Sequence, residues 1–138
     1  MRELKFRCFY RGEMYPVKEL YESGYVGLIE DKDGMMVSPD SEHVKGIMQY
    51  TGLNDKNYNE IYEGDIITFG RDRNYCVVFQ DGAFTLMHHG RLKSSDHPGL
   101  KEIDGTPLRW GLISRVKELN FEAEVIGNIY QNPELLNP

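Results

Sequence analysis

The first residues of this sequence that could do chemistry are three histidines. His88 and His89 are adjacent and His97 follows eight positions after them, with Asp81 and Asp96 as nearby carboxylates. Imidazole and carboxylate groups are zinc ligands, but this spacing matches no standard zinc site. Neighbouring side chains of a strand point to opposite faces, so only one of the adjacent pair could join a ligand set unless the strand ends there. We therefore interpret these histidines as solvent-exposed loop residues.

Two acidic segments resemble the start of a calcium-binding loop. Asp55 opens one of them, but its sixth position is Glu60, where an EF-hand loop needs Gly, and its twelfth is Ile66, where the loop needs a bidentate Glu. Residues 31–34 are too few and lack the closing acid. The sequence thus excludes calcium at Asp55 and favours a hairpin turn at residues 31–34.

Paired carboxylates for acid–base catalysis could be imagined among the remaining acidic residues, which are Glu60, Glu63 and Asp65. No partner base, phosphate-binding loop or oxyanion donor is adjacent to it. The GxGxxG, GxxxxGKS/T, GxSxG and HExxH signatures do not occur either. We therefore expect solvated surface acids, no catalytic residue, no cofactor and no metal.

One local group of cations could contact nucleic acid. It consists of Arg71, Arg73, Arg91 and Lys93, with Tyr75 nearby. Four charges are a weak footprint for nucleic-acid binding. The net charge of −6 also opposes non-specific attraction to phosphates. An ordinary solvated face is favoured, and a nucleic-acid-binding module is the alternative.

Alternating apolar residues predict a β-rich N-terminal region over residues 1–50. The expected extended segments are residues 4–10, 14–17, 25–29, 35–37 and 43–50. Pro16 would confine the second segment to an edge of the sheet, because proline cannot donate to a ladder.

Residues 51–138 are expected to form the second, compact part of the chain. Its strands are predicted at residues 66–69, 75–80, 83–87 and 123–130. Asp81 and Gly82 between two of these strands are the signature of a two-residue type I′ hairpin turn. Together with the N-terminal region, this indicates a mainly β fold.

One or two short helices are expected in the C-terminal part. Apolar residues recur every three or four positions at Leu108, Leu112, Val116 and Leu119, after Thr106 as a cap and Pro107 at the first helical position. Asn132, followed by Pro133 and an acidic residue, predicts one final helical turn.

Turn residues set among apolar ones dominate three blocks of the sequence. Gly64 and Asp65 could bend the chain sharply, with the carboxylate accepting backbone N–H groups before a strand begins at Ile66. Gly127, inside an apolar run, predicts a bulge or a close approach of two backbones. The residues to which we assign structural roles are Thr51, Gly52, Ile61, Tyr62, Glu63, Gly64, Asp65, Gly127, Asn128 and Pro133.

These blocks together resemble the YopX family of phage and prophage proteins. They are residues 48–53, 61–66 and 125–136, and the resemblance extends to residues 5–7. It implies a small SH3-like β-barrel in the C-terminal part, a phage or prophage origin, and no established biochemical activity. One departure is Tyr58, where the family usually places Gly, so we expect Asn57 or Asn59 to take the left-handed conformation instead.

Composition agrees with a small intracellular β protein. A hydrophobic content of 40% in 138 residues allows one domain, or one domain with an arm, to bury a core. Cys8 and Cys76 are isolated, which indicates two buried thiols in a reducing compartment. The N-terminus lacks the apolar region of a signal peptide, and no apolar run is long enough to span a membrane. We therefore expect the bacterial host cytoplasm.

The function expected from these patterns is non-catalytic contact with a protein partner or self-association, through exposed β edges or the N-terminal region. Nucleic-acid binding is the rival function, and a metal-dependent hydrolase around His88, His89 and His97 is a third.

Overall fold

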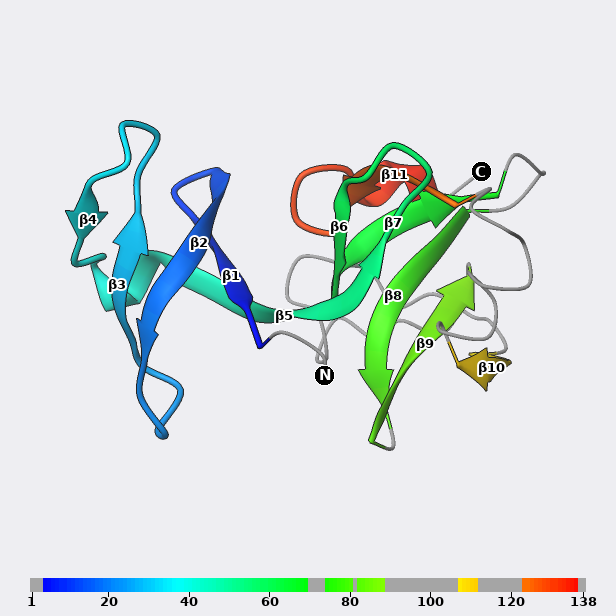
Figure 1. Ribbon diagram of the computed structural model, residues 1–138, viewed down its shortest axis with the longest axis horizontal. Helices are drawn as coiled ribbons and strands as arrows, with labels where there is room; N and C mark the ends of the chain where they lie inside the picture. The colour runs from blue at the N-terminus through cyan, green and yellow to red at the C-terminus, as the bar shows by residue number, and fades with distance from the viewer. Residues whose placement is uncertain (1–3, 70–73, 81, 89–106, 112–122, 137–138) are drawn as a thin grey trace. The chain divides into compact units, whose positions relative to one another are not determined.

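Strands dominate the computed structural model, which describes residues 4–69, 74–80, 82–88, 107–111 and 123–136 (Figure 1). The chain divides into two compact units, residues 1–50 and residues 51–138. The strands pair in two antiparallel sheets, which confirms the mainly β prediction. No pairing among the described strands closes a barrel. The helices of the described segments are 3-10 turns.

Unit 1 is a sheet built from successive hairpins. Its elements are β1 (Phe6–Tyr10), β2 (Glu13–Leu20), β3 (Val26–Glu30), β4 (Met36–Val37), the 3-10 helix η1 (Ser41–His43) and β5 (Val44–Asn54), which continues into unit 2. The strands lie in the order β4-β3-β2-β1-β5. Cys8, Val26 and Ile29 form its buried core. Cys8 alternates with more exposed residues along β1, as the period of a half-buried sheet requires, whereas in β3 both Val26 and the adjacent Gly27 are buried.

Pro16 lies inside the sheet of unit 1, so the predicted edge strand is wrong. Its strand, β2, has β1 on one side and β3 on the other. Pro16 is opposite Arg7 of β1, whereas the pairing with β3 begins only at Val17. The proline therefore occupies a position where β2 has a single partner, and this explains how the sheet accommodates a residue without an N–H group.

Unit 2 contains the second sheet. Its elements are β6 (Glu60–Tyr62), β7 (Asp65–Thr68), β8 (Asn74–Gln80), β9 (Ala83–His88), β10 (Pro107–Gly111), β11 (Glu124–Asn128) and the 3-10 helix η2 (Pro133–Leu136). The order of this sheet is β10-β9-β8-β7-β11, while β6 pairs with β5.

Both faces of the second sheet are buried. Adjacent residues Ile66 and Ile67 of β7 point to opposite faces and are both fully buried. One face packs in a cluster of Ile61, Ile67, Phe69, Val77, Phe84, Leu86 and Ala123. The other packs in a cluster of Ile66, Cys76, Val78, Met87, Ile129 and Leu136. A strand covered on both faces has consecutive rather than alternating apolar residues, as Ile66 and Ile67 of β7 show.

The hairpin between β8 and β9 has the predicted two-residue loop. Gln80 pairs with Ala83, and the register continues without a shift to Tyr75 opposite His88. The final helical turn also forms, as η2.

The predicted helix that starts at Pro107 is wrong where the structure describes it. Residues 107–111 form β10, which pairs with β9 at Met87 and Thr85. A short helix is marginal by itself, whereas the free side of β9 offers a ladder of backbone partners. Proline is tolerated at the first residue of a strand. The rest of that predicted helix, residues 112–119, lies outside the described residues, as does Thr106.

Candidate functional site

The Gly64–Asp65 turn shows what the polar residues of the sequence blocks do. Gly64 has a φ of 88°, a conformation that residues with a Cβ rarely adopt. Its N–H donates to the carbonyl of Val77 at 2.7 Å, and its carbonyl accepts from Ile129 at 2.9 Å. The carboxylate of Asp65 is buried and accepts the N–H of Tyr62 at 2.8 Å, so the expectation that Asp65 is a solvated surface acid is wrong. This turn therefore holds three segments of unit 2 together, two through the backbone of Gly64 and one through the Asp65 carboxylate.

Thr51 has a comparable role at the start of unit 2. Its side chain is 1% exposed. The hydroxyl donates to the carbonyl of Ile61 at 2.7 Å and accepts from the N–H of Leu53 at 3.1 Å. Gly52 next to it has a positive φ of 86°. These bonds fix the end of β5 against β6.

The amide of Asn128 organises the turn after β11. Its Oδ1 accepts the N–H groups of Tyr130 and Gln131 at 3.0 and 2.9 Å, and its Nδ2 donates to the Gln131 side chain. The Asn128 N–H donates to Asn132 Oδ1 at 3.2 Å. Pro133 then begins η2. The side chains of this block are thus engaged within their own turn.

Gly127 lies at an irregularity in the ladder, where the register of β11 against β7 shifts between Val125 and Gly127. A Cβ at Gly127 would lie 2.6 Å from Asn132 Oδ1 and 2.9 Å from Asn132 Cβ. Only glycine lets the turn after β11 pack this closely on the strand.

Sequence reasoning missed the central role of Asp55, which is 2% exposed. Its carboxylate accepts the N–H groups of Asn57, Asn59 and Val125 at 2.8–2.9 Å, and the Asn59 side chain at 3.3 Å. Burial alone would raise the pKa of this carboxyl, but the donors of Val125, Asn59 and Asn57 outweigh burial and hold its pKa below the ordinary value. An Asp followed by Asn two and four positions later is the local signal of such a turn.

Tyr58 itself takes the left-handed conformation, with a φ of 66°, so the expectation that Asn57 or Asn59 would do so is wrong. The Asp55 carboxylate accepts the N–H groups of both asparagines. These bonds fix the two flanking residues and leave the left-handed position to the residue between them. The Tyr58 side chain is 86% exposed.

No candidate for catalysis emerges among the described residues. No three His, Cys, Asp or Glu side chains within them come close enough to hold a metal ion. His88 ends β9, and His89 and His97 lie outside the described segments. Burial raises the pKa of the Cys8 thiol to about 11, so this thiol stays protonated and is a poor nucleophile. No helix in the described part of the chain is both long and apolar enough to span a membrane.

The predicted nucleic-acid contacts, Arg71, Arg73, Arg91 and Lys93, all lie outside the described residues. Tyr75, their aromatic neighbour, is half-buried and packs on Phe69 with ring centroids 5.6 Å apart. Nucleic-acid binding by the four cations stays a prediction. Titration of labelled DNA and RNA at two salt concentrations tests it, because phosphate contacts weaken steeply with salt.

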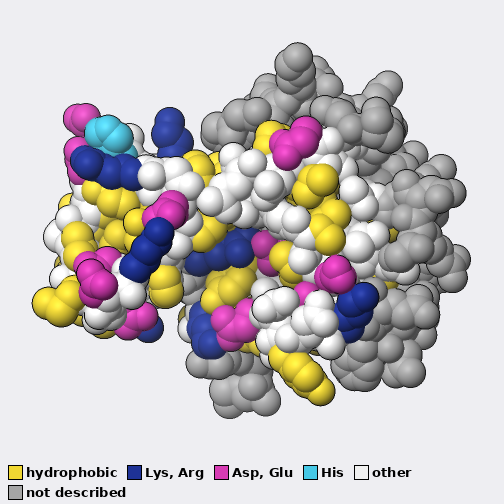
Figure 2. Space-filling view, turned by 90° about the horizontal axis from the view of Figure 1, so that it is seen from above, with side chains coloured by type: hydrophobic (Ala, Val, Ile, Leu, Met, Phe, Trp, Pro, Cys, Tyr) yellow, Lys and Arg dark blue, Asp and Glu magenta, His cyan; other side chains and the backbone are white. Residues whose placement is uncertain are grey.

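Exposed apolar side chains gather at β4 in unit 1. Met35, Met36 and Val37 are 63%, 51% and 37% exposed. Met36 and Val37 form β4, which is the end strand of its sheet and pairs with β3, and Met35 directly precedes it. Figure 2 shows hydrophobic side chains at the surface of unit 1, in yellow, among charged ones. This apolar sheet edge, which we call the β4 edge, is the candidate functional site.

The fold and this site define a small, mainly β protein whose buried polar residues hold turns and whose sheet edge is open. The model of the family described as YopX protein matches residues 5–137, and the chain belongs to that family. Its structure is similar to the crystal structure of protein EF1440 from Enterococcus faecalis, with 24% identity and a TM-score of 0.60. The alignment covers 99% of this chain and 100% of that one, and it shows a shared fold. No curated protein is a significant match.

Proposed function

We propose that this chain is a non-catalytic protein of phage or prophage origin, acting in the bacterial host cytoplasm, that associates with a second copy of itself through the β4 edge. The observation that carries the proposal is the exposure of Met35, Met36 and Val37 on the end strand of a sheet. A protein partner that adds a strand at the same edge is the other form of this function.

Edge strands attract further strands because their outer N–H and C=O groups have no ladder partner. Many proteins guard such edges with charged residues or proline, or keep the edge strand short. β4 is short, but it has neither a charged residue nor proline, since it consists of Met36 and Val37 and follows the exposed Met35. Two copies related by a two-fold axis would place β4 beside β4, with each copy covering the apolar side chains of the other.

The proposed architecture of unit 2 complements this function. We assign unit 2 an SH3-like barrel that serves as a stable scaffold. Support comes from the consecutive antiparallel strands β7, β8 and β9, from β11 beside β7, and from core clusters on both faces of the sheet. Because the motif side chains of unit 2 hold turns, binding is expected at unit 1.

Light scattering across a range of protein concentrations tests the proposal. The wild type is expected to dimerise, and Met36→Lys is expected to be monomeric, because a charge on the edge strand opposes pairing. Tyr58→Lys is the matched control, since it places the same charge at an exposed apolar residue far from the edge in sequence. The proposal would be contradicted by two results together. The wild type stays monomeric, and no protein from infected-cell extract binds the wild type while failing to bind Met36→Lys.

A further inference from the structure

A second surface of unit 1 combines two exposed tyrosine rings with a carboxylate. Tyr21 and Tyr25 are 52% and 46% exposed, and their ring centroids lie 5.8 Å apart at an interplanar angle of 35°. The Tyr21 hydroxyl donates to Glu19 Oε1 at 2.7 Å. Exposed aromatic rings beside a carboxylate have the two chemical features that attract an organic cation, a π face and a negative charge. We call Glu19, Tyr21 and Tyr25 the tyrosine patch.

The backbone positions these three side chains. The turn between β2 and β3 is closed by hydrogen bonds from Tyr21 N to Tyr25 O at 2.9 Å and from Gly24 N to Tyr21 O at 2.8 Å. The register of β2 against β3 shifts on both sides of Glu19. The patch is therefore largely formed before any partner arrives, which lowers the entropy cost of binding.

Gly27 of β3 provides the space that the patch needs. A Cβ at this position would collide with Glu19 Oε1 and would lie 3.0 Å from a ring carbon of Tyr21. The side chains of Glu19 and Tyr21 thus lie across β3 at Gly27, which has no side chain of its own. This packing ties the orientation of Glu19 and Tyr21 to the sheet beneath them.

A hollow of about 280 Å³ adjoins the patch and shares Tyr25 with it. Val26, Val44 and Ile47 contribute apolar side chains to its lining, and Gly24, Ser41 and Gly46 line the rest. A cavity of this volume suits one side chain of a bound peptide rather than a whole small-molecule ligand.

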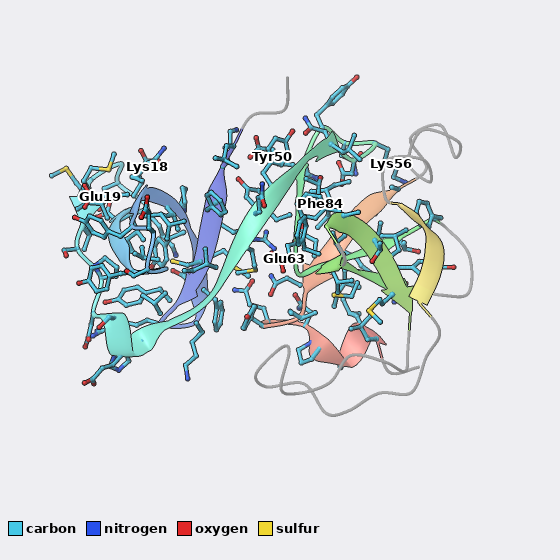
Figure 3. The ribbon with its side chains drawn as sticks, turned by 90° about the horizontal axis from the view of Figure 1, so that it is seen from below. Lys18, Glu19, Tyr50, Lys56, Glu63 and Phe84 are labelled. Carbon is cyan, nitrogen blue, oxygen red and sulfur yellow. The ribbon has the colours of Figure 1, made fainter. Side chains whose placement is uncertain are left out.

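No cation among the described residues pairs with Glu19. Lys18, the adjacent residue on β2, is labelled with Glu19 in Figure 3 and forms no ion pair with it. The exposed Glu22 adds a second negative charge to the same turn, and the net charge of the chain is −6. The charge of this surface therefore complements a cationic partner and disfavours phosphate backbones.

We propose that the tyrosine patch binds an arginine side chain of a partner protein, with the residue next to that arginine entering the adjoining hollow. A guanidinium is planar, so it can stack on a tyrosine ring while its N–H groups donate to the Glu19 carboxylate. An ammonium group has no plane with which to stack. This inference rests on the proposed role in protein contact but uses a surface separate from the β4 edge.

The test follows amide NMR signals of the full chain during titration with the capped peptide acetyl-Gly-Arg-Leu-amide. We expect shifts at Glu19, Tyr21 and residues 24–27. The same peptide with citrulline, which is nearly isosteric and uncharged, is expected to bind about tenfold more weakly, because it loses the charge-assisted hydrogen bonds. Added salt should weaken only the arginine peptide.

Variants separate recognition from folding. Glu19→Gln should reduce the affinity for the arginine peptide to that for the citrulline peptide. Tyr25→Phe should keep binding and Tyr25→Leu should lose it, since only the former retains the π face. Tyr58→Leu, at an exposed tyrosine of unit 2, is the control and should bind normally, and thermal unfolding checks that all variants are folded.

Met36→Lys should bind the peptide like the wild type, so failure of the β4 edge proposal and failure of this one are distinguishable. Absence of shifts at the patch, equal affinity for the citrulline peptide, or unchanged binding by folded Glu19→Gln would each overturn the inference.

Discussion

Asp55 connects two parts of unit 2 that are distant in the sequence. Its carboxylate accepts N–H groups from its own turn and from Val125, which is seventy positions further along the chain. Removal of this buried carboxylate would leave the N–H donors without partners, which costs more than the loss of the same hydrogen bonds at a solvent-exposed position. The stability of the fold should therefore depend strongly on this side chain.

Replacement of Asp55 by Ala should lower the free energy of unfolding by about 2–4 kcal/mol at neutral pH. Because the pKa of Asp55 is below its ordinary value, its charge stabilises the fold at pH values above the ordinary carboxyl pKa. The stabilisation is lost as the pH falls through the lowered pKa, so the difference between wild type and variant should narrow in acid. Urea unfolding at neutral and acidic pH measures both effects.

Asp31 offers a matched control for this experiment. Its carboxylate accepts the N–H groups of Asp33 and Met35 in an exposed turn. Water can replace those bonds, so Asp31→Ala should cost no more than about 1 kcal/mol. Equal losses for the two variants would show that the bond to Val125 contributes little.

The left-handed conformation of Tyr58 gives a second prediction at the residue scale. Tyr58→Gly should be more stable than Tyr58→Ala by about 0.5–1 kcal/mol, because alanine keeps the Cβ that disfavours a φ of 66°. Both variants remove the exposed ring, so their difference isolates the backbone. Thermal unfolding of the pair measures it, and an alanine variant as stable as the glycine variant would refute the assignment of this conformation.

Gly127 gives the third residue-scale prediction. Gly127→Ala should destabilise unit 2 by about 1–3 kcal/mol, since the new Cβ collides with the Asn132 side chain. The same substitution in an Asn132→Gly background should cost less, because the colliding atoms are gone. Equal costs in both backgrounds, measured by urea unfolding, would place the strain elsewhere.

At the scale of elements, the structure that a segment adopts depends both on its local sequence pattern and on the strands with which it can pair. The hairpin between β8 and β9 follows from a turn signal between two apolar runs, and the structure has it. The apolar residues from Leu108 to Leu119 have a helical spacing, yet residues 107–111 pair with β9 as β10. The spacing of apolar residues could not reveal this pairing, because the pairing depends on the open side of β9, about twenty residues earlier in the chain.

The 3-10 helix η2 contributes a core residue despite its short length. Leu136 is 1% exposed and packs with Ile66, Cys76 and Val78, while the carbonyl of Leu135 accepts from the Asn74 side chain at 2.8 Å. Leu136→Ala should therefore cost about 2–4 kcal/mol. Leu135→Ala, at a half-buried neighbour, should cost clearly less, and urea unfolding of both variants compares them.

At the scale of the whole molecule, the two units differ in how much core they contain. Unit 1 has a single cluster with three buried residues, whereas unit 2 has two clusters, one on each face of its sheet. The boundary at Tyr50 and Thr51 falls within β5, which pairs with β1 before it and β6 after it. Unit 1 should thus be the less stable part.

Expression of residues 51–138 alone tests this difference. We expect a folded fragment with dispersed amide NMR signals and a cooperative thermal transition, because its clusters are complete without unit 1. Residues 1–50 alone should be largely unfolded. A cooperative fold in the shorter fragment, or none in the longer one, would contradict the prediction.

Local signals in the sequence were enough to predict the mainly β class, the hairpins and the turn at Gly64 and Asp65. Each of these depends on residues within a few positions of one another, where chain stereochemistry decides the outcome. The bond from Asp55 to Val125, the strand at residues 107–111 and the left-handed Tyr58 emerged only in the folded chain. So did the exposure of the β4 edge and of the tyrosine patch, because burial depends on which distant segments pack together.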